Sequence, residues 1–196
     1  MITNHKHYLN LAFKIAETNL GKTKFNPSVG TIVVKNNTVI SSGVTSLNGR
    51  PHAEFNALKK KNNFKGASLY TTLEPCTHQG LTPPCVNIIK KNKIKNVYYA
   101  FDDPDERPHK KAKNVLKKKN IKVKKIFNKN FKNFYKSYFF NRKFKQPFIS
   151  AKIAISQDYF SINKKSKWIT NEHSQKVTHL LRSKYDCIFS TSKTIN

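Results

Sequence analysis

Short segments of strand-forming residues alternate along this chain with segments of helical pattern. The strand-type segments are rich in Val, Ile, Tyr and Thr, and the helical segments place apolar residues three and four apart. Strands are expected at residues 31–34, 39–44, 68–75, 96–104 and 121–127, and helices at 5–20, 53–61, 83–91 and 109–119. This alternation predicts an α/β domain with helices on both faces of a sheet. The sheet should be mixed, because the first two strands are close enough to form an antiparallel hairpin.

An aromatic and basic segment follows the last of these strands. Phe127, Phe131, Phe134, Tyr135 and Tyr138 have a spacing that predicts one helix with an aromatic stripe. Interleaved basic and aromatic residues also occur in proteins that bind single-stranded nucleic acid. We favour docking of the stripe against the domain.

The chain of 196 residues carries a formal net charge of +28. Of its 38 basic residues 34 are Lys and four are Arg, whereas a surface that grips phosphates is expected to use more Arg. A base-composition bias explains this charge better than a nucleic-acid partner does. There is no apolar run of membrane-spanning length and no signal-peptide pattern, so the sequence predicts a cytoplasmic protein without a membrane partner.

Three separated residues form the most informative motif of the sequence. His52, Cys76 and Cys85 offer one imidazole and two thiolates, which suit zinc with a fourth position left for water. Three cysteines are too few for a disulfide framework, which supports a metal site in a reducing compartment. Glu54 follows His52 by two residues and is expected to move a proton between that water and a leaving amine. A structural zinc site with His78 as fourth ligand is the alternative, but it leaves Glu54 without a role.

The arrangement His-x-Glu, then Pro-Cys, then a second Cys is the signature of zinc deaminases. Here eight residues separate the two cysteines, where that signature has two. The long spacing, with THQGLTPPC at 77–85, NPSVG at 26–30 and Asp-Pro at 103–104, resembles the deaminase domain of the bifunctional riboflavin-biosynthesis deaminase/reductase. The resemblance covers about residues 5–145.

The resemblance implies a three-layer α/β/α fold of the cytidine-deaminase type for residues 1–145. It also implies hydrolytic removal of the 2-amino group from 2,5-diamino-6-(5-phosphoribosylamino)pyrimidin-4-one. By position, His52, Cys76 and Cys85 would bind zinc, Glu54 would be the proton shuttle, and Asn26 would lie in the substrate pocket.

Residues 146–196 resemble the start of the family's NADPH-dependent reductase domain. Strands are expected at 147–158 and 187–192 and a helix at 171–183, which together are too short for an independent α/β domain. The resemblance implies that Ala154, Trp168 and Thr194 contact the nicotinamide cofactor, and that Ser166 and Arg182 contact the reductase substrate. NADPH is therefore expected only if another chain completes the domain.

Some positions depart from the family pattern. Leu81 stands where relatives usually have Arg or Lys, Thr45 where they commonly have His, and Asp105 begins a loop that differs from theirs. Two other functions stay open: a deaminase of another nucleobase or of RNA, and a nonenzymatic basic zinc protein that binds nucleic acid. A homo-oligomer and a separate reductase chain are the protein partners considered.

Overall fold

The computed structural model describes residues 4–60, 62–105, 111–127, 129–161 and 168–191. The chain divides into two compact units, Met1–Gln146 and Pro147–Asn196. The first unit contains the sheet and the metal-ligand motif, and each unit is described by itself.

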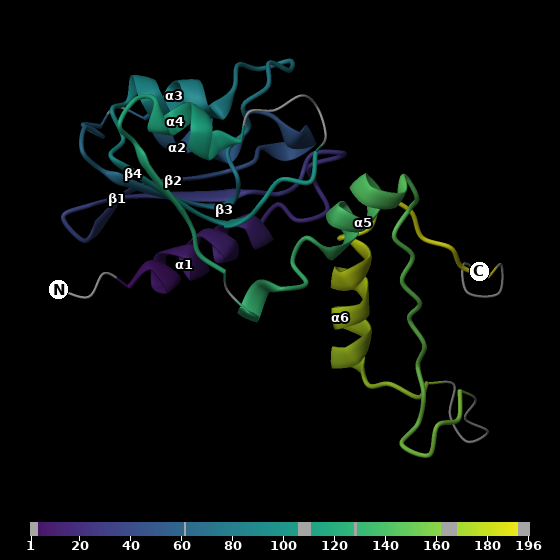
Figure 1. Cartoon of the computed structure of the whole chain (residues 1–196). Helices are drawn as coiled ribbons and strands as arrows, with labels where there is room; N and C mark the ends of the chain where they lie inside the picture. The colour runs from purple at the N-terminus through teal and green to yellow at the C-terminus, as the bar shows by residue number, and fades with distance from the viewer. Residues whose placement is uncertain (1–3, 61, 106–110, 128, 162–167, 192–196) are drawn as a thin grey trace. The chain divides into compact units, whose positions relative to one another are not determined.

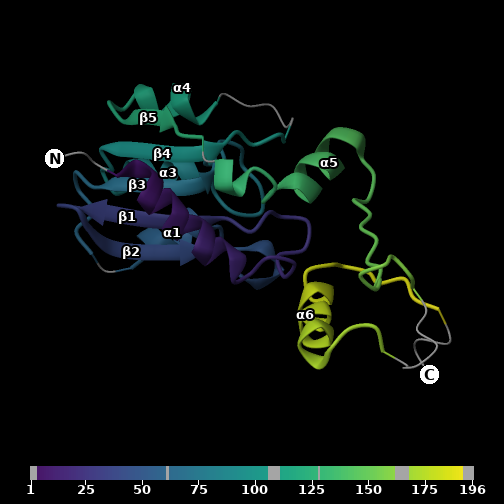
Figure 2. The same cartoon turned by 90° about the horizontal axis from the view of Figure 1, so that it is seen from below.

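A five-stranded mixed sheet forms the centre of the first unit. Its strands are β1 (Gly30–Lys35), β2 (Thr38–Val44), β3 (Ser68–Leu73), β4 (Asn96–Phe101) and β5 (Lys122–Lys125). They are arranged in the order β2-β1-β3-β4-β5 (Figure 2). β1 is antiparallel to both β2 and β3, whereas β4 is parallel to β3 and to β5. The predicted mixed sheet is confirmed.

The hairpin between β1 and β2 turns through two asparagines. Asn36 has φ 50° and Asn37 has φ 60°, so both lie in the left-handed region. A tight turn of this hand matches the twist of the flanking strands, and Asn tolerates the conformation better than most residues. The local sequence therefore explains the hairpin directly.

Helices cover both faces of the sheet. α2 (Ala53–Leu58), α3 (Cys85–Lys91) and α4 (Ala112–Lys117) lie on one face, and α1 (His5–Glu17) lies on the other (Figure 1). Successive residues of β1 point to opposite faces, because Val33 packs with α2 to α4 while Ile32 and Val34 pack with α1. The three-layer fold predicted from the sequence is confirmed, although most elements end a few residues earlier than expected.

The aromatic segment docks on the α1 side of the sheet, but it is not one helix. It forms a short 3-10 turn, η2 (Lys129–Phe131), and then α5 (Lys136–Phe144). Phe131 stacks on Phe13 of α1 with ring centroids 4.1 Å apart, and the Tyr135 hydroxyl donates to the Ser28 carbonyl over 3.0 Å. Phe, Asn and Tyr have low helix propensity, so these contacts decide the local conformation. The docking prediction is right, and the prediction of a single helix is wrong.

The second unit contains one helix among its described residues, α6 (Glu172–Arg182), as expected. The described residues within 147–158 and 187–191 form no strand, so the prediction of strands there is wrong. Strands need hydrogen-bonded neighbours, and this unit provides no paired neighbour within its described residues. Ile149, Ile153, Ile188 and Phe189 remain exposed in consequence.

Among the described residues, no helix is both long enough and apolar enough to cross a bilayer.

The contact between β2 and α2 gives a testable prediction. A Cβ atom on Gly43 would lie 2.4 Å from the Ala53 carbonyl oxygen and 2.5 Å from the Ala57 nitrogen, so a side chain there would push α2 away from the sheet. We expect Gly43→Ala to lower the free energy of unfolding by about 1–3 kcal/mol, measured by urea denaturation. Ser42→Ala on the same strand is the control. Equal stability of the Gly43→Ala variant and the parent would contradict the tight packing.

Candidate metal centre and active site

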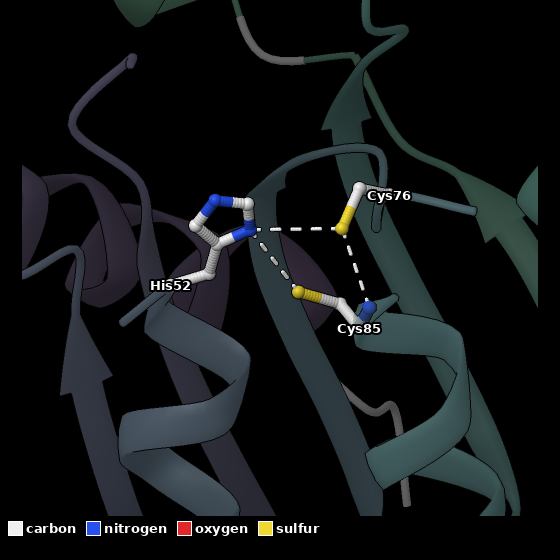
Figure 3. A group of neighbouring side chains, drawn as sticks. All are labelled: His52, Cys76 and Cys85. Atoms are coloured by element: carbon white, nitrogen blue, oxygen red, sulfur yellow. Dashed lines mark hydrogen bonds between the residues drawn. The ribbon is translucent and has the colours of Figure 1, made fainter. Parts of the chain in front are cut away.

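His52 lies at the start of α2. It is the N-cap residue of this helix, in an extended conformation, and its ring faces the side chains of Cys76 and Cys85 (Figure 3). Asn56 holds the preceding loop, because its side-chain amide donates to the Val44 carbonyl over 2.8 Å and to the Ser46 hydroxyl over 2.8 Å. The backbone that carries His52 is thereby tied to the end of β2.

The two cysteines come from the loop after β3 and from the start of α3. Cys85 is the first residue of α3, and Cys76 follows the end of β3 by three residues. The Cys85 backbone N–H donates to the Cys76 Sγ over 3.2 Å, which links the two positions (Figure 3). The eight residues between the cysteines thus form a loop that returns to its own beginning.

The three side chains have the spacing of a tetrahedral zinc site. The His52 Nδ1 lies 3.6 Å from the Cys76 Sγ and 3.4 Å from the Cys85 Sγ, and all three ligand atoms are within 4.8 Å of one another. Zinc bond lengths of ~2.3 Å to sulfur and ~2.0 Å to nitrogen, at tetrahedral angles, place neighbouring ligand atoms about 3.5–3.8 Å apart. The residues therefore fit zinc, and three protein ligands leave the fourth position open.

The two cysteines differ in pKa: that of Cys76 is lowered, whereas the hydrogen bond with Cys76 and burial raise that of Cys85. Hydrogen bonding with Cys85 is the largest influence that lowers the pKa of Cys76, to about 4, and His52 adds to it. The pKa of His52 is raised, chiefly through its hydrogen bond to Cys76. A thiolate is the form of cysteine that binds metal, so Cys76 is already suited to a cation, and Cys85 would lose its proton on binding one.

Glu54 is the second residue of α2 and lies beside the metal ligands. Its side chain is 4% exposed, and its Oε2 accepts a hydrogen bond from the Cys85 Sγ over 3.3 Å. Burial, together with the charge of Cys76, raises the pKa of Glu54 to about 7. A carboxyl group of this kind, next to a metal site, is suited to both taking up and releasing a proton.

A pocket that is partly open to solvent lies directly over this cluster. Its lining residues come from α2, the end of β3, α5 and nearby loops: Asn26, Pro27, Val29, Thr45, Arg50, His52, Glu54, Leu73, Glu74, Cys76, His78, Asp103, Asp105 and Tyr138. The metal ligands and Glu54 therefore line one partly open pocket.

Asn26, which the sequence places in the pocket, lines this cavity. Its side-chain amide donates to the Gly49 carbonyl over 3.0 Å, which fixes the orientation of the amide. Of the three departures, Thr45 and Asp105 also line the cavity, and Leu81 is 91% exposed.

Some lining residues were not predicted from the sequence. Glu74 is buried and accepts from the Ala112 N–H over 2.8 Å, while the Tyr138 hydroxyl donates to Asp103 over 3.0 Å. Glu74 directly precedes the Pro-Cys motif, so the sequence could have indicated that it lies near the site. Tyr138 gives no such signal, because its place in the cavity wall depends on how α5 docks.

The described residues that were expected to serve a reductase do not form a site by themselves. Ala154 lies in a segment without strand pairing, Trp168 is 58% exposed, and Arg182 is exposed on α6. Ser166 and Thr194 lie outside the described residues. The described residues of the second unit do not by themselves fit a dinucleotide.

The fold and the metal centre define a class of protein. Residues 2–101 match the family model of the cytidine and deoxycytidylate deaminase zinc-binding region. The chain belongs to this family.

Within that class, the chain is similar to riboflavin biosynthesis proteins named RibD. It is 35% identical to RibD of Aquifex aeolicus over 97% of this chain and 54% of that protein, and 38% identical to RibD of Buchnera aphidicola over 96% of this chain and 52% of that protein. A diaminohydroxyphosphoribosylaminopyrimidine deaminase/5-amino-6-(5-phosphoribosylamino)uracil reductase from Thermotoga maritima superposes with a TM-score of 0.81 at 30% identity, over 90% of this chain and 52% of the other. The chain therefore spans about half the length of the relatives it matches.

The metal centre predicts one zinc ion per chain in the purified protein. We expect Cys85→Ser to reduce bound zinc at least about tenfold, because the site loses one of its three protein ligands. Atomic emission spectroscopy of the dialysed protein measures this. Cys187→Ser is the matched control, since Cys187 is exposed and belongs to the second unit. Full zinc content in Cys85→Ser would remove Cys85 from the ligand set.

Proposed function

We propose that this chain catalyses the hydrolytic deamination of 2,5-diamino-6-(5-phosphoribosylamino)pyrimidin-4-one, a step of riboflavin biosynthesis. The observation that carries the proposal is the position of Glu54 beside a His52, Cys76 and Cys85 zinc site, at the bottom of a cavity. The similarity to deaminase/reductase proteins supports the choice of substrate.

The reaction replaces an amino group on the pyrimidine ring by oxygen. The oxygen of water forms a bond to C2 of the ring, and the bond from C2 to the amino nitrogen breaks, so that ammonia leaves. Bound zinc supplies Lewis-acid activation of the water at neutral pH. Glu54 takes the proton from the water and returns it to the departing nitrogen.

Other residues of this chain would orient the ring. Asn26 presents an amide to the cavity, held by Gly49, and is suited to hydrogen bonds with the amide-like edge of a pyrimidinone. Burial of Glu54 excludes bulk water from its carboxyl group, so its proton is exchanged with the reacting groups.

The thiols set the cellular compartment in which the enzyme can work. Cys76 and Cys85 bind zinc only while they are reduced, and the cytoplasm keeps thiols reduced. We therefore place the enzyme in the cytoplasm, with a small phosphorylated aminopyrimidine as its partner.

Removing the proton shuttle tests the proposal. We expect Glu54→Gln to keep its zinc and to lose about 10²- to 10⁴-fold in kcat, because the amide has the same shape but cannot accept the proton. Ammonia release from the phosphoribosylaminopyrimidinone measures activity, with cytidine and deoxycytidylate as competing substrates.

Glu17→Gln is the control for this substitution, because Glu17 is exposed on α1. Glu54→Gln protein that retains zinc and deaminates at the parent rate would contradict the assignment. Faster turnover of cytidine than of the phosphoribosylaminopyrimidinone would favour a nucleoside deaminase instead.

For the second unit, we propose that residues 146–196 are the first part of a reductase domain. The exposed apolar side chains at Ile149, Ile153 and Phe189 would be covered by the rest of such a domain, in the same polypeptide or in another chain. In the completed domain, Ala154, Trp168 and Thr194 would contact NADPH, and Ser166 and Arg182 would contact its substrate.

This assignment predicts that the chain of 196 residues does not bind NADPH by itself. Its described cofactor candidates lie on an unpaired segment and at an exposed Trp168, so a nicotinamide would find no enclosed surface. A titration followed by NADPH fluorescence should show no saturation in the micromolar range. Saturable binding would show that residues 146–196 build the cofactor site alone.

A further inference from the structure

Several carboxyl groups line the cavity. Glu54, Glu74, Asp103 and Asp105 all line it. Glu74 has the Lys111 ammonium 3.7 Å away, whereas a negatively charged substrate group would be repelled near Asp103 and Asp105. The position of any compensating cation therefore decides where such a group can lie.

Arg50 is the one arginine among the described residues that line the cavity. One of its nitrogens, Nη1, donates to the Thr82 Oγ1 over 2.7 Å, which holds the side chain against the loop 78–82. Thr82 is its one hydrogen-bond acceptor within the described part of the chain, and no carboxylate there is within ion-pair distance. The guanidinium thus keeps several N–H groups for a ligand.

Gly80 and His78 complete this part of the rim. A Cβ built on Gly80 would lie 3.3 Å from Nη2 of Arg50 and 3.8 Å from Nε2 of His78, so a guanidinium and an imidazole flank a position that has no side chain. Leu81, in the same loop, is exposed and has no polar group. The positive charge at this rim therefore comes from Arg50, which lies outside the loop and two residues before the metal ligand His52.

We propose that Arg50 binds the anionic group of the substrate, a phosphate monoester, at the rim formed by His78, Gly80 and Thr82. This inference rests on the proposed function for the identity of the substrate. It also orients the substrate, with the phosphate at Arg50 and the aminopyrimidine at Glu54 and the metal ligands. Planar guanidinium groups pair with phosphate oxygens through two parallel hydrogen bonds, which a lysine cannot reproduce.

Ribose 5-phosphate is the probe for the anion site, with ribose as its uncharged counterpart. In NMR titrations of the zinc-loaded protein at fixed ionic strength, we expect ribose 5-phosphate to bind more tightly than ribose. Arg50→Gln should weaken ribose 5-phosphate binding about 10- to 100-fold, leave ribose unchanged and retain zinc. Arg50→Lys should recover only part of the loss.

Lys65→Gln is the matched control, because it also removes one positive charge but lies exposed before β3, outside the cavity lining. Equal binding of ribose and ribose 5-phosphate to the parent, or equal weakening by Lys65→Gln and Arg50→Gln, would overturn the proposal. So would an unchanged affinity in Arg50→Gln.

Kinetics separate this inference from the proposed function. If the chain deaminates the phosphoribosylaminopyrimidinone, Arg50→Gln should raise KM with little change in kcat, and the dephosphorylated substrate should show no such effect. If the parent releases no ammonia, the proposed function fails, while the ribose 5-phosphate titration still decides the role of Arg50. A fall in kcat with both substrates would indicate that Arg50 acts on the metal centre instead.

Discussion

Zinc coordination sets a geometric requirement on which the rest of the structure depends. Three atoms from the start of α2, the loop after β3 and the start of α3 must lie about 3.5–3.8 Å apart. The sheet achieves this because β2 and β3 both flank β1, and α2 packs against β2 so closely that Gly43 has no room for a side chain. A shift of α2 would move His52 and Glu54 together.

The packing of α2 against β2 also explains the position of Glu54. A single residue, Ala53, separates His52 from Glu54 at the start of one short helix, so one element positions a metal ligand and a proton carrier. Burial against the core then changes the chemistry of the carboxyl group, because desolvation opposes its ionisation. The arrangement on the other side of the cavity depends on α5, which brings Tyr138 to Asp103.

The second unit shows what a chain segment does without its packing partners. Its sequence contains strand-type segments with apolar residues at alternate positions, yet only α6 forms among the described residues. A helix satisfies its own backbone hydrogen bonds, whereas a strand requires a neighbour. The local pattern is therefore sufficient for the helix and insufficient for the strands.

The sequence alone determined the α/β class, the hairpin at Asn36 and Asn37, and the metal ligands with Glu54, because periodicity, turn chemistry and ligand type are local properties. It did not determine how residues 127–138 fold, because contacts of their aromatic side chains with Phe13 and the sheet compete with the formation of one helix. Only the tertiary structure placed Glu74, Tyr138 and Arg50 in one cavity wall. Those three come from elements distant in the chain, and their proximity depends on how the helices pack against the sheet.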